Sequence, residues 1–186
     1  MRIYTRRGDD GTTGLYFGGR TAKDAPVVDA YGSVDEAQAF LGLVRAEAEP
    51  GSELDELLVD LERDLWVLMA DLATAPENRH KLEAGRSMVT PAMVDGVEGR
   101  IDALAERFDV PAEFVVPGQT RPAALLDVAR TVVRRAERLA VGAAVDGSLA
   151  VAYLNRLSDL LWAMARWQEG HSLPTRQSRT ERPEET

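Results

Sequence analysis

Charged side chains crowd into the segment 130–138, which lies within an otherwise apolar stretch of helical spacing. On a helix, Arg130, Arg134 and Arg138 recur every four residues and share one face, with Glu137 three residues after Arg134. Like charges at this spacing repel by about 0.2–0.5 kcal/mol per pair, so the helix gains no stability from them. The pattern therefore indicates either a solvated basic face or a surface that binds an anionic ligand.

The overall composition bears on the choice between these two interpretations. The chain has 186 residues, is 45% hydrophobic and carries a net charge of −9, which is typical of one acidic domain with a core. Such a protein is not expected to bind nucleic acid, so the arginines form a local positive site suited to a small anion. The sequence has no apolar run of about 18 residues, no secretory signal and no cysteine. We therefore expect a cytoplasmic protein that does not interact with membranes.

A second group of candidate residues lies near the N-terminus, in the segment Thr5–Gly14. Its glycines let a ligand approach the backbone N–H groups, and its threonines and arginines, with Lys23 downstream, can donate to phosphate oxygens. Asp9 or Asp10 could help to hold Mg²⁺. The segment is not a Walker A loop, because GxxxxGK[ST] is absent. The alternative is a flexible N-terminus with turns.

Two further polar pairs fall within apolar helical stretches. Asp35 and Glu36 either complement the dipole of a first helical turn or pair with an arginine of the basic segment. Asn155 and Asp159, four residues apart, either fix helix packing through hydrogen bonds or contribute to the same site. Buried amides and carboxylates need partners, and the arginines are obvious ones.

Hydrophobic periodicity predicts an all-α bundle of five helices that positions these groups. The helices are expected at about residues 27–49, 52–76, 90–108, 122–142 and 148–168. Residues 1–30 show no helical period and predict an ordered N-terminal loop, with a short strand at Met1–Thr5. We expect a single domain over residues 1–170, with an N-terminal loop at 1–25 suited to phosphate, a further loop at 77–89 and a polar tail at 171–186.

Six segments, in order, resemble the PduO-type ATP:cob(I)alamin (corrinoid) adenosyltransferases. The resemblance covers roughly residues 3 to 168 and rests on residues 4–11, 23–24, 30–36, 114–118, 129–138 and 154–159. It implies a ferritin-like five-helix bundle that forms a homotrimer with ATP sites between subunits. The chain departs from the family pattern at Gln119-Thr120-Arg121, where a second glycine or Ser-Gly commonly follows the Pro-Gly pair.

The resemblance assigns roles to individual residues. ATP would be bound by Thr5, Arg6, Arg7, Gly8, Asp9, Gly11, Thr12, Thr13 and Lys23 of one subunit and by Arg134, Arg135, Glu137, Arg138 and Asn155 of the adjacent one. Glu137 is a candidate ligand of ATP-bound Mg²⁺. The corrin side would be formed by Asp35, Phe114 and Arg130, with Arg130 paired to Asp35 and Phe114 on the lower face of the corrin. Together with Arg134, these three are the residues implied in catalysis.

The function that the resemblance implies is transfer of the 5′-deoxyadenosyl group of ATP to the cobalt of cob(I)alamin, giving adenosylcobalamin and triphosphate. A flavoprotein reductase and an adenosylcobalamin-dependent mutase would be the protein partners. One alternative is a non-catalytic carrier that delivers adenosylcobalamin to a mutase. Another is an ATP hydrolase or kinase, which the missing Walker motif and the lack of a plausible base disfavour.

Overall fold

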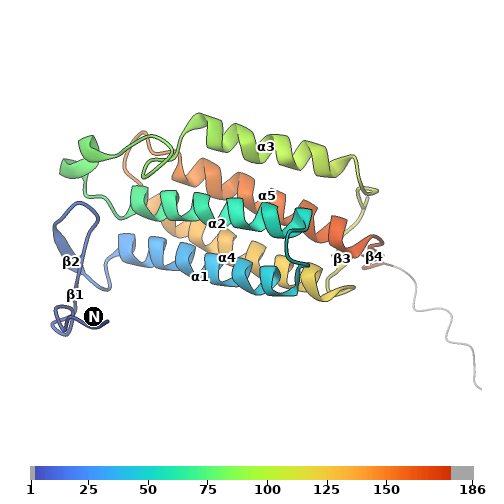
Figure 1. The fold of residues 1–186 in the computed structure, drawn as a ribbon, viewed down its shortest axis with the longest axis horizontal. Helices are drawn as coiled ribbons and strands as arrows, with labels where there is room; N and C mark the ends of the chain where they lie inside the picture. The colour runs from blue at the N-terminus through green and yellow to red at the C-terminus, as the bar shows by residue number, and fades with distance from the viewer. Residues whose placement is uncertain (1–2, 177–186) are drawn as a thin grey trace, which may run out of the picture.

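Five long α-helices run side by side along the molecule in the computed structural model, which describes residues 3–176 (Figure 1). They are α1 (Pro26–Glu47), α2 (Glu53–Leu72), α3 (Pro91–Ala105), α4 (Arg121–Ala143) and α5 (Ala150–Glu169). A 3₁₀ helix, η1 (Pro76–Lys81), follows α2, within the stretch predicted to be a loop. The expected all-α bundle is confirmed.

Side-chain caps define where several helices begin. The Ser52 hydroxyl accepts the backbone N–H of Asp55 at the start of α2, as its position in the sequence predicts. Thr90 caps α3 in the same way, with Pro91 in the first turn. The predicted cap of α5 at Ser148 is wrong: the N-cap is Leu149, which makes no side-chain cap bond, although the Ser148 hydroxyl accepts the N–H of Ala150.

α1, α2 and α3 end two to four residues before their predicted ends, whereas α4 and α5 each end one residue beyond theirs. The prediction extended α2 to residue 76, but it ends at Leu72, where the Ala73 carbonyl accepts the N–H of Tyr16 from the N-terminal segment. The prediction extended α3 to Phe108, but it ends at Ala105. Instead, the Phe108 ring packs edge-on against the Trp162 ring of α5, with 6.1 Å between the two ring centres.

The core lies along the axis of the bundle. α1 packs against α2 and α4, and α5 packs against α4 and α3. Leucines at helical spacing on α2, including Leu58, Leu61 and Leu65, are fully buried, as the periodicity predicts. Tyr153 of α5 is also fully buried and donates from its hydroxyl to Asp64 of α2 at 2.8 Å.

A buried carboxylate joins the segments at one end of the bundle. Asp71, at the end of α2, accepts hydrogen bonds from the Arg79 guanidinium at 2.9 Å and from the Ser148 hydroxyl at 3.0 Å. Its second oxygen accepts the backbone N–H of Val89 at 2.9 Å. The carboxylate thus ties α2 to η1, to the loop before α3 and to the start of α5, and its partners compensate its burial.

Two small antiparallel sheets lie at opposite ends of the bundle (Figure 1). β1 (Thr12–Gly14) and β2 (Arg20–Ala22) form a hairpin beside the start of α1. β3 (Val115–Val116) and β4 (Leu173–Pro174) pair at the other end. The strand predicted at Met1–Thr5 is absent over the described residues 3–5, and Met1 and Arg2 lie outside the described part. Over the described residues, no helix is long and apolar enough to cross a membrane.

Candidate active site

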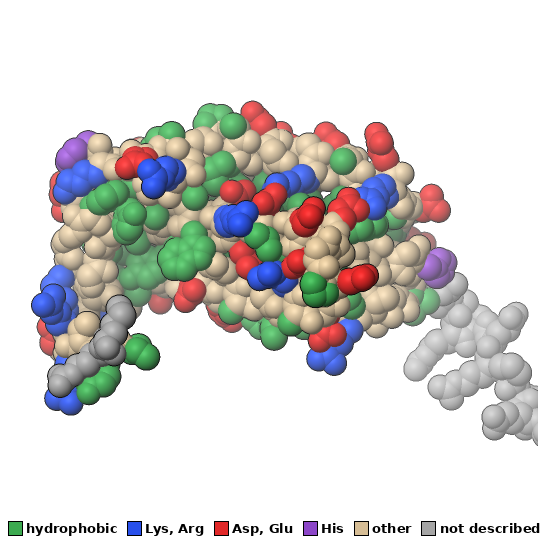
Figure 2. Space-filling view, viewed as in Figure 1, with side chains coloured by type: hydrophobic (Ala, Val, Ile, Leu, Met, Phe, Trp, Pro, Cys, Tyr) green, Lys and Arg blue, Asp and Glu red, His purple; other side chains and the backbone are tan. Residues whose placement is uncertain are grey.

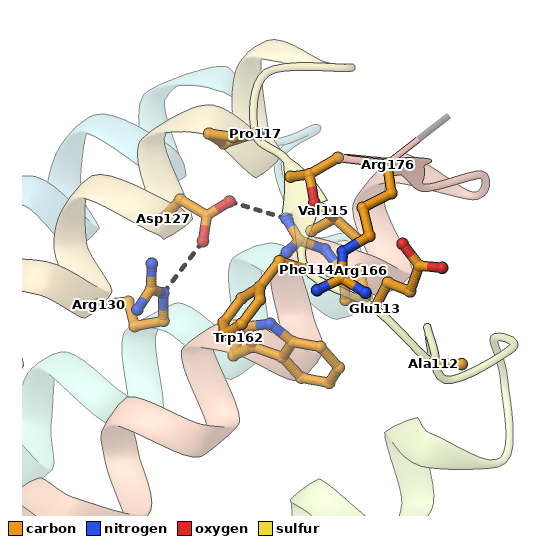
Figure 3. Close-up of a pocket in the computed structure, with 11 residues that line it drawn as sticks. Ala112, Glu113, Phe114, Val115, Pro117, Asp127, Arg130, Trp162, Arg166 and Arg176 are labelled. Carbon is orange, nitrogen blue, oxygen red and sulfur yellow. Dashed lines mark hydrogen bonds and ion pairs between the residues drawn. The ribbon is translucent and has the colours of Figure 1, made fainter. Parts of the chain in front are cut away.

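A cavity of about 580 Å³ opens between the β3 segment, α4 and α5 (Figure 3). This volume lies in the range of pockets that hold small molecules. Its walls carry the aromatic side chains of Phe114 and Trp162 and the guanidinium groups of Arg130 and Arg166. The cavity thus offers apolar surface with a few charged groups, which suits a large, flat, partly polar ligand.

Phe114 stands at the mouth of this cavity with 87% of its surface exposed. Its backbone is held in place, because the Phe114 carbonyl accepts the N–H of Thr175 at 2.8 Å and the following residues form β3 with β4. The first residues of the predicted tail therefore pair with the segment that carries Phe114. Residues 177–186 of that tail lie outside the described part.

Arg130 does not pair with Asp35 within the chain, contrary to the expected contact. Its Nε donates to Asp127, one turn earlier on α4, at 3.0 Å. Asp35 is exposed on α1, and Gln38, one turn further along that helix, donates to the Glu62 carbonyl of α2. Asp35 makes no hydrogen bond or ion pair with a described residue, whereas Arg130 is held by Asp127.

The other charged residues of α4 divide between two sides of the helix. Glu137 accepts a hydrogen bond from the Asn155 amide of α5 at 2.9 Å, so these two predicted site residues meet. Arg134 and Arg138 are exposed and form no ion pair with any described residue. Arg135 instead pairs with Glu36 of α1. Arg135 thus faces α1, whereas Glu137 faces α5.

The N-terminal loop is organised around Asp10. Its carboxylate accepts the hydroxyl of Thr12 at 2.8 Å and the N–H of Thr12 at 3.0 Å, and these bonds hold the pKa of Asp10 below its ordinary value. Arg20 of β2 donates to the Thr12 hydroxyl and to the Arg7 carbonyl. A side chain at Gly8 would come within 3.2 Å of the Lys23 ammonium, so glycine lets this lysine approach the loop.

The predicted residues of the N-terminal loop are exposed or partly exposed around this framework. This group comprises Thr5, Arg6, Arg7, Gly8, Asp9, Gly11, Thr12, Thr13 and Lys23. Figure 2 shows lysine and arginine side chains gathered at this end of the molecule. Gly11 adopts a left-handed conformation with φ of +80°, which glycine tolerates and other residues rarely adopt. Backbone and basic side chains are thus available to an anionic ligand.

No group of three or more potential metal-binding side chains occurs among residues 3–176. A magnesium ion usually takes one or two protein carboxylates and fills its remaining positions with water and substrate phosphates. Asp9 is exposed beside the loop, and Glu137 is partly exposed on α4. These residues fit a magnesium ion that arrives with a nucleotide better than one held by the protein alone.

Asp127, Trp162 and Arg166 line the cavity but are not among the predicted site residues. Asp127 lies one turn before Arg130, a spacing that could have indicated an ion pair. Trp162 and Arg166 lie within the apolar run of α5, where the periodicity was assigned to the core. An arginine in such a run is a usable signal, because a charged group is rarely buried without a partner.

The fold and the cavity define a helical-bundle protein that binds small molecules, and comparison with known proteins identifies the family. The cobalamin adenosyltransferase family model matches residues 3–168. A corrinoid adenosyltransferase of Mycobacterium tuberculosis is 43% identical over 171 residues, covering 89% of this chain and 87% of that protein. A corrinoid adenosyltransferase of Bacillus subtilis is 40% identical over 173 residues, which cover 89% of this chain and 86% of that protein.

Solved structures agree with these relatives. A variant of a PduO-type ATP:corrinoid adenosyltransferase from Lactobacillus reuteri, complexed with cobalamin and ATP, aligns with a TM-score of 0.85 at 29% identity. The alignment covers 95% of this chain and 97% of that one. The protein described here belongs to the cobalamin adenosyltransferase family.

Proposed function

We propose that the protein transfers the 5′-deoxyadenosyl group of ATP to the cobalt of cob(I)alamin. The observation that carries this proposal is the match to the family over nearly the whole described chain, together with an apolar cavity bordered by arginines. Co(I) supplies the electron pair for a new bond to C5′ of ATP. The C5′–O bond breaks, and triphosphate leaves with its electron pair. No protein nucleophile or general base is needed for this displacement.

The nucleotide half of the site consists of the N-terminal loop and the charged residues of α4 with Asn155 of α5. The loop offers backbone N–H groups, hydroxyls and Lys23 to the phosphates. Arg134 and Arg138 supply positive charge that no described residue neutralises. Such charge stabilises the negative charge that develops on the departing triphosphate, and Mg²⁺ bound with ATP adds to it. Glu137 is the candidate protein ligand of that ion.

The corrin half consists of the cavity and Phe114. A bulky aromatic side chain against the lower face of the corrin leaves no room for an axial ligand to cobalt. Cobalt without that ligand is easier to reduce to the nucleophilic Co(I) state, so ligation tunes the chemistry of the substrate. The apolar surfaces of Phe114 and Trp162 in the cavity wall support the same outcome.

The two halves require more than one subunit, and the family resemblance supports a homotrimer as that assembly. The N-terminal loop and the Phe114 segment lie at opposite ends of the bundle (Figure 1). They are separated by about 33 Å, the length of α1 at 1.5 Å per residue. Displacement needs the reacting atoms about 3–3.5 Å apart. The loop of one subunit must therefore serve the cavity of another, and Asp35 could then reach the partner's Arg130.

The physiological setting follows from the chemistry. The substrate must be reduced to Co(I), so a flavoprotein reductase is the expected source of the electron. The product is a cofactor, so an adenosylcobalamin-dependent mutase is the expected recipient. We place the reaction in the cytoplasm, where ATP is plentiful.

The test is anaerobic incubation of the purified protein with ATP, Mg²⁺ and chemically reduced cobalamin. We expect the visible spectrum to change to that of adenosylcobalamin and triphosphate to appear in equal amount. Reactions without ATP or without protein are the controls. Folded protein that binds adenosylcobalamin tightly but produces none would instead establish a carrier. Release of ADP would point to a hydrolase or kinase.

A further inference from the structure

Arg166 is a buried charged group that the proposed reaction does not use. It lies on α5 with only 2% of its side chain exposed and lines the cavity beside Phe114 and Arg130 (Figure 3). A buried guanidinium is unfavourable unless carboxylates and hydrogen bonds compensate it. The partners of Arg166 therefore indicate what the protein gains by keeping a charge there.

Three neighbours fix the orientation of Arg166. Its Nη2 donates to Oδ2 of Asp127 at 2.7 Å and to Oε1 of Glu169 at 2.9 Å. The guanidinium also lies over the Trp162 ring, 5.7 Å from its centre. Its Nε is buried and has no hydrogen-bond partner among the described residues. Arg166 is thus held through a single nitrogen, Nη2, which Asp127 and Glu169 share.

Asp127 is shared between two arginines, with one oxygen for each. Oδ2 takes Arg166, and Oδ1 accepts the Nε of Arg130 at 3.0 Å. A carboxylate with both oxygens free commonly grips an arginine through two parallel hydrogen bonds. Because Arg166 occupies Oδ2, Asp127 holds Arg130 through Nε alone. The Nη groups of Arg130 form no ion pair with any described residue and remain available at the cavity.

The charges of this cluster balance in a way that permits Arg130 to change partner. Arg166 and Arg130 carry two positive charges, and Asp127 and Glu169 carry two negative charges. If the Arg130 guanidinium turns toward a ligand or another carboxylate, Asp127 keeps its bond to Arg166. No buried carboxylate is then left without a partner, so the movement avoids the penalty of an isolated buried charge.

We propose that Arg166 is a positioning residue for the corrin half of the site: by occupying one oxygen of Asp127, it keeps the Nη end of Arg130 free to act at the cavity. This inference rests on the proposed function, which assigns the cavity to the corrin. It assigns Arg166 no contact with the reacting atoms. Its effect reaches the substrate only through Asp127 and Arg130.

The first test is the variant Arg166→Met, which keeps a long apolar side chain and frees Oδ2 of Asp127. We expect kcat with reduced cobalamin to fall at least tenfold per mole of folded protein, whereas the KM for ATP changes less than twofold. Arg166→Lys, which can still pair with Oδ2, should keep most of the activity. Wild-type kcat in Arg166→Met would overturn the proposal.

A second substitution separates positioning from a loss of packing. In Arg166→Met/Asp127→Asn, the amide has only one acceptor oxygen and cannot hold Arg130 through two bonds. We expect the double variant to recover several-fold of the kcat lost in Arg166→Met. A double variant no more active than the single one would contradict the proposal. Arg79→Met is the matched control: it breaks another largely buried Arg–Asp pair, at the far end of the bundle, and should lower thermal stability but not kcat with cobalamin.

A crystal structure of Arg166→Met gives a readout that does not depend on activity. We expect Arg130 to bind both oxygens of Asp127, through Nε and one Nη. An unchanged Arg130 side chain would refute the inference even if the enzyme is an adenosyltransferase. Conversely, failure of the wild-type protein to adenosylate cobalamin would refute the proposed function, whatever this structure shows.

Discussion

Arg134 is the residue whose removal tests the nucleotide half of the site with the least disturbance of the fold. It is exposed on α4 and forms no ion pair with a described residue, so Arg134→Ala should change the free energy of unfolding by less than about 0.5 kcal/mol. Loss of one charge contact to a transition state commonly lowers kcat about 10²–10³-fold, and we expect at least that here. Steady-state kinetics with reduced cobalamin would measure it.

Arg63→Ala provides the comparison for this prediction. Arg63 is equally basic and exposed, but it lies on α2 and contacts Asp60 at 3.7 Å. Its removal should leave kcat unchanged. If Arg134→Ala keeps a rate close to that of Arg63→Ala, the assignment of Arg134 to the triphosphate is wrong.

Phe114 tests the corrin half in a different way, because its effect should depend on the oxidation state supplied. The side chain is 87% exposed, so Phe114→Ala should not destabilise the fold. Removing it should admit an axial ligand to cobalt and hinder reduction. We expect a larger loss of activity when cob(II)alamin is reduced during the assay than when pre-reduced cob(I)alamin is supplied. Equal losses in the two assays would argue against displacement of the ligand.

The contact between α2 and α5 predicts a pH dependence of stability. Burial raises the pKa of Asp64, although its hydrogen bond from Tyr153 acts in the opposite direction. The folded protein then binds a proton that the unfolded chain releases as the pH rises above the ordinary value of 3.8. The stability contributed by this group is present below that pH and is lost as the pH rises through the raised value.

Asp64→Asn should flatten this dependence, because the amide does not ionise and can still accept the Tyr153 hydroxyl. Urea unfolding between about pH 4 and pH 7 would show it as a smaller fall in the free energy of unfolding than in the wild type. Glu56→Gln, which removes an exposed carboxylate of the same helix, is the control. Glu62 also has a raised pKa through burial, so some dependence should remain. If the free energy of unfolding changes with pH equally in Asp64→Asn and in the wild type, the dependence does not come from Asp64.

At the level of the helices, the sequence predicts type and number better than extent. Leucine spacing on α2 predicts a helix because a buried stripe needs a 3.6-residue period, and Ser52 predicts its start because the cap is local. Its end depends on Tyr16, more than 50 residues earlier, and is not readable locally. The hairpin strands are three residues each, too short for an alternating pattern to indicate them.

The site residues divide in the same way, into those that the local sequence predicts and those whose partners lie far away in the chain. Phe114, Arg130 and Glu137 are predicted because they lie in recognisable segments. The hydrogen bond between Glu137 and Asn155 agrees equally with a shared site and with helix packing. The partner of Arg130 is not predicted, since Asp127 and Arg166 belong to no such segment. The expected pairing with Asp35 depends on how chains assemble, which one chain does not specify.

For the whole molecule, the separation of the two half-sites can be tested by mixing subunits. Asp35→Ala and Arg130→Ala proteins should each have low activity. If Asp35 and Arg130 act together across a subunit contact, unfolding the two variants together and refolding them forms some sites with both native residues. Activity should then rise above the sum of the separate proteins, as measured by the spectral assay.

Each variant refolded alone and mixed afterwards is the control, because no subunits exchange before the assay. No gain after joint refolding would mean that the two residues do not meet between subunits. Light scattering of the refolded mixture would establish that assembly was complete and equal in both samples.

The pairing of β4 with the Phe114 segment separates the ability to fold from the ability to function. A nonsense mutation or proteolytic cut just after α5 would leave every long helix and nearly the whole buried core intact. Such a shortened chain should persist in the cell as a stable protein. It would nevertheless lack the N–H group of Thr175 that holds the Phe114 carbonyl. A lesion of this kind would escape quality control based on stability and be detected only by its effect on the reaction.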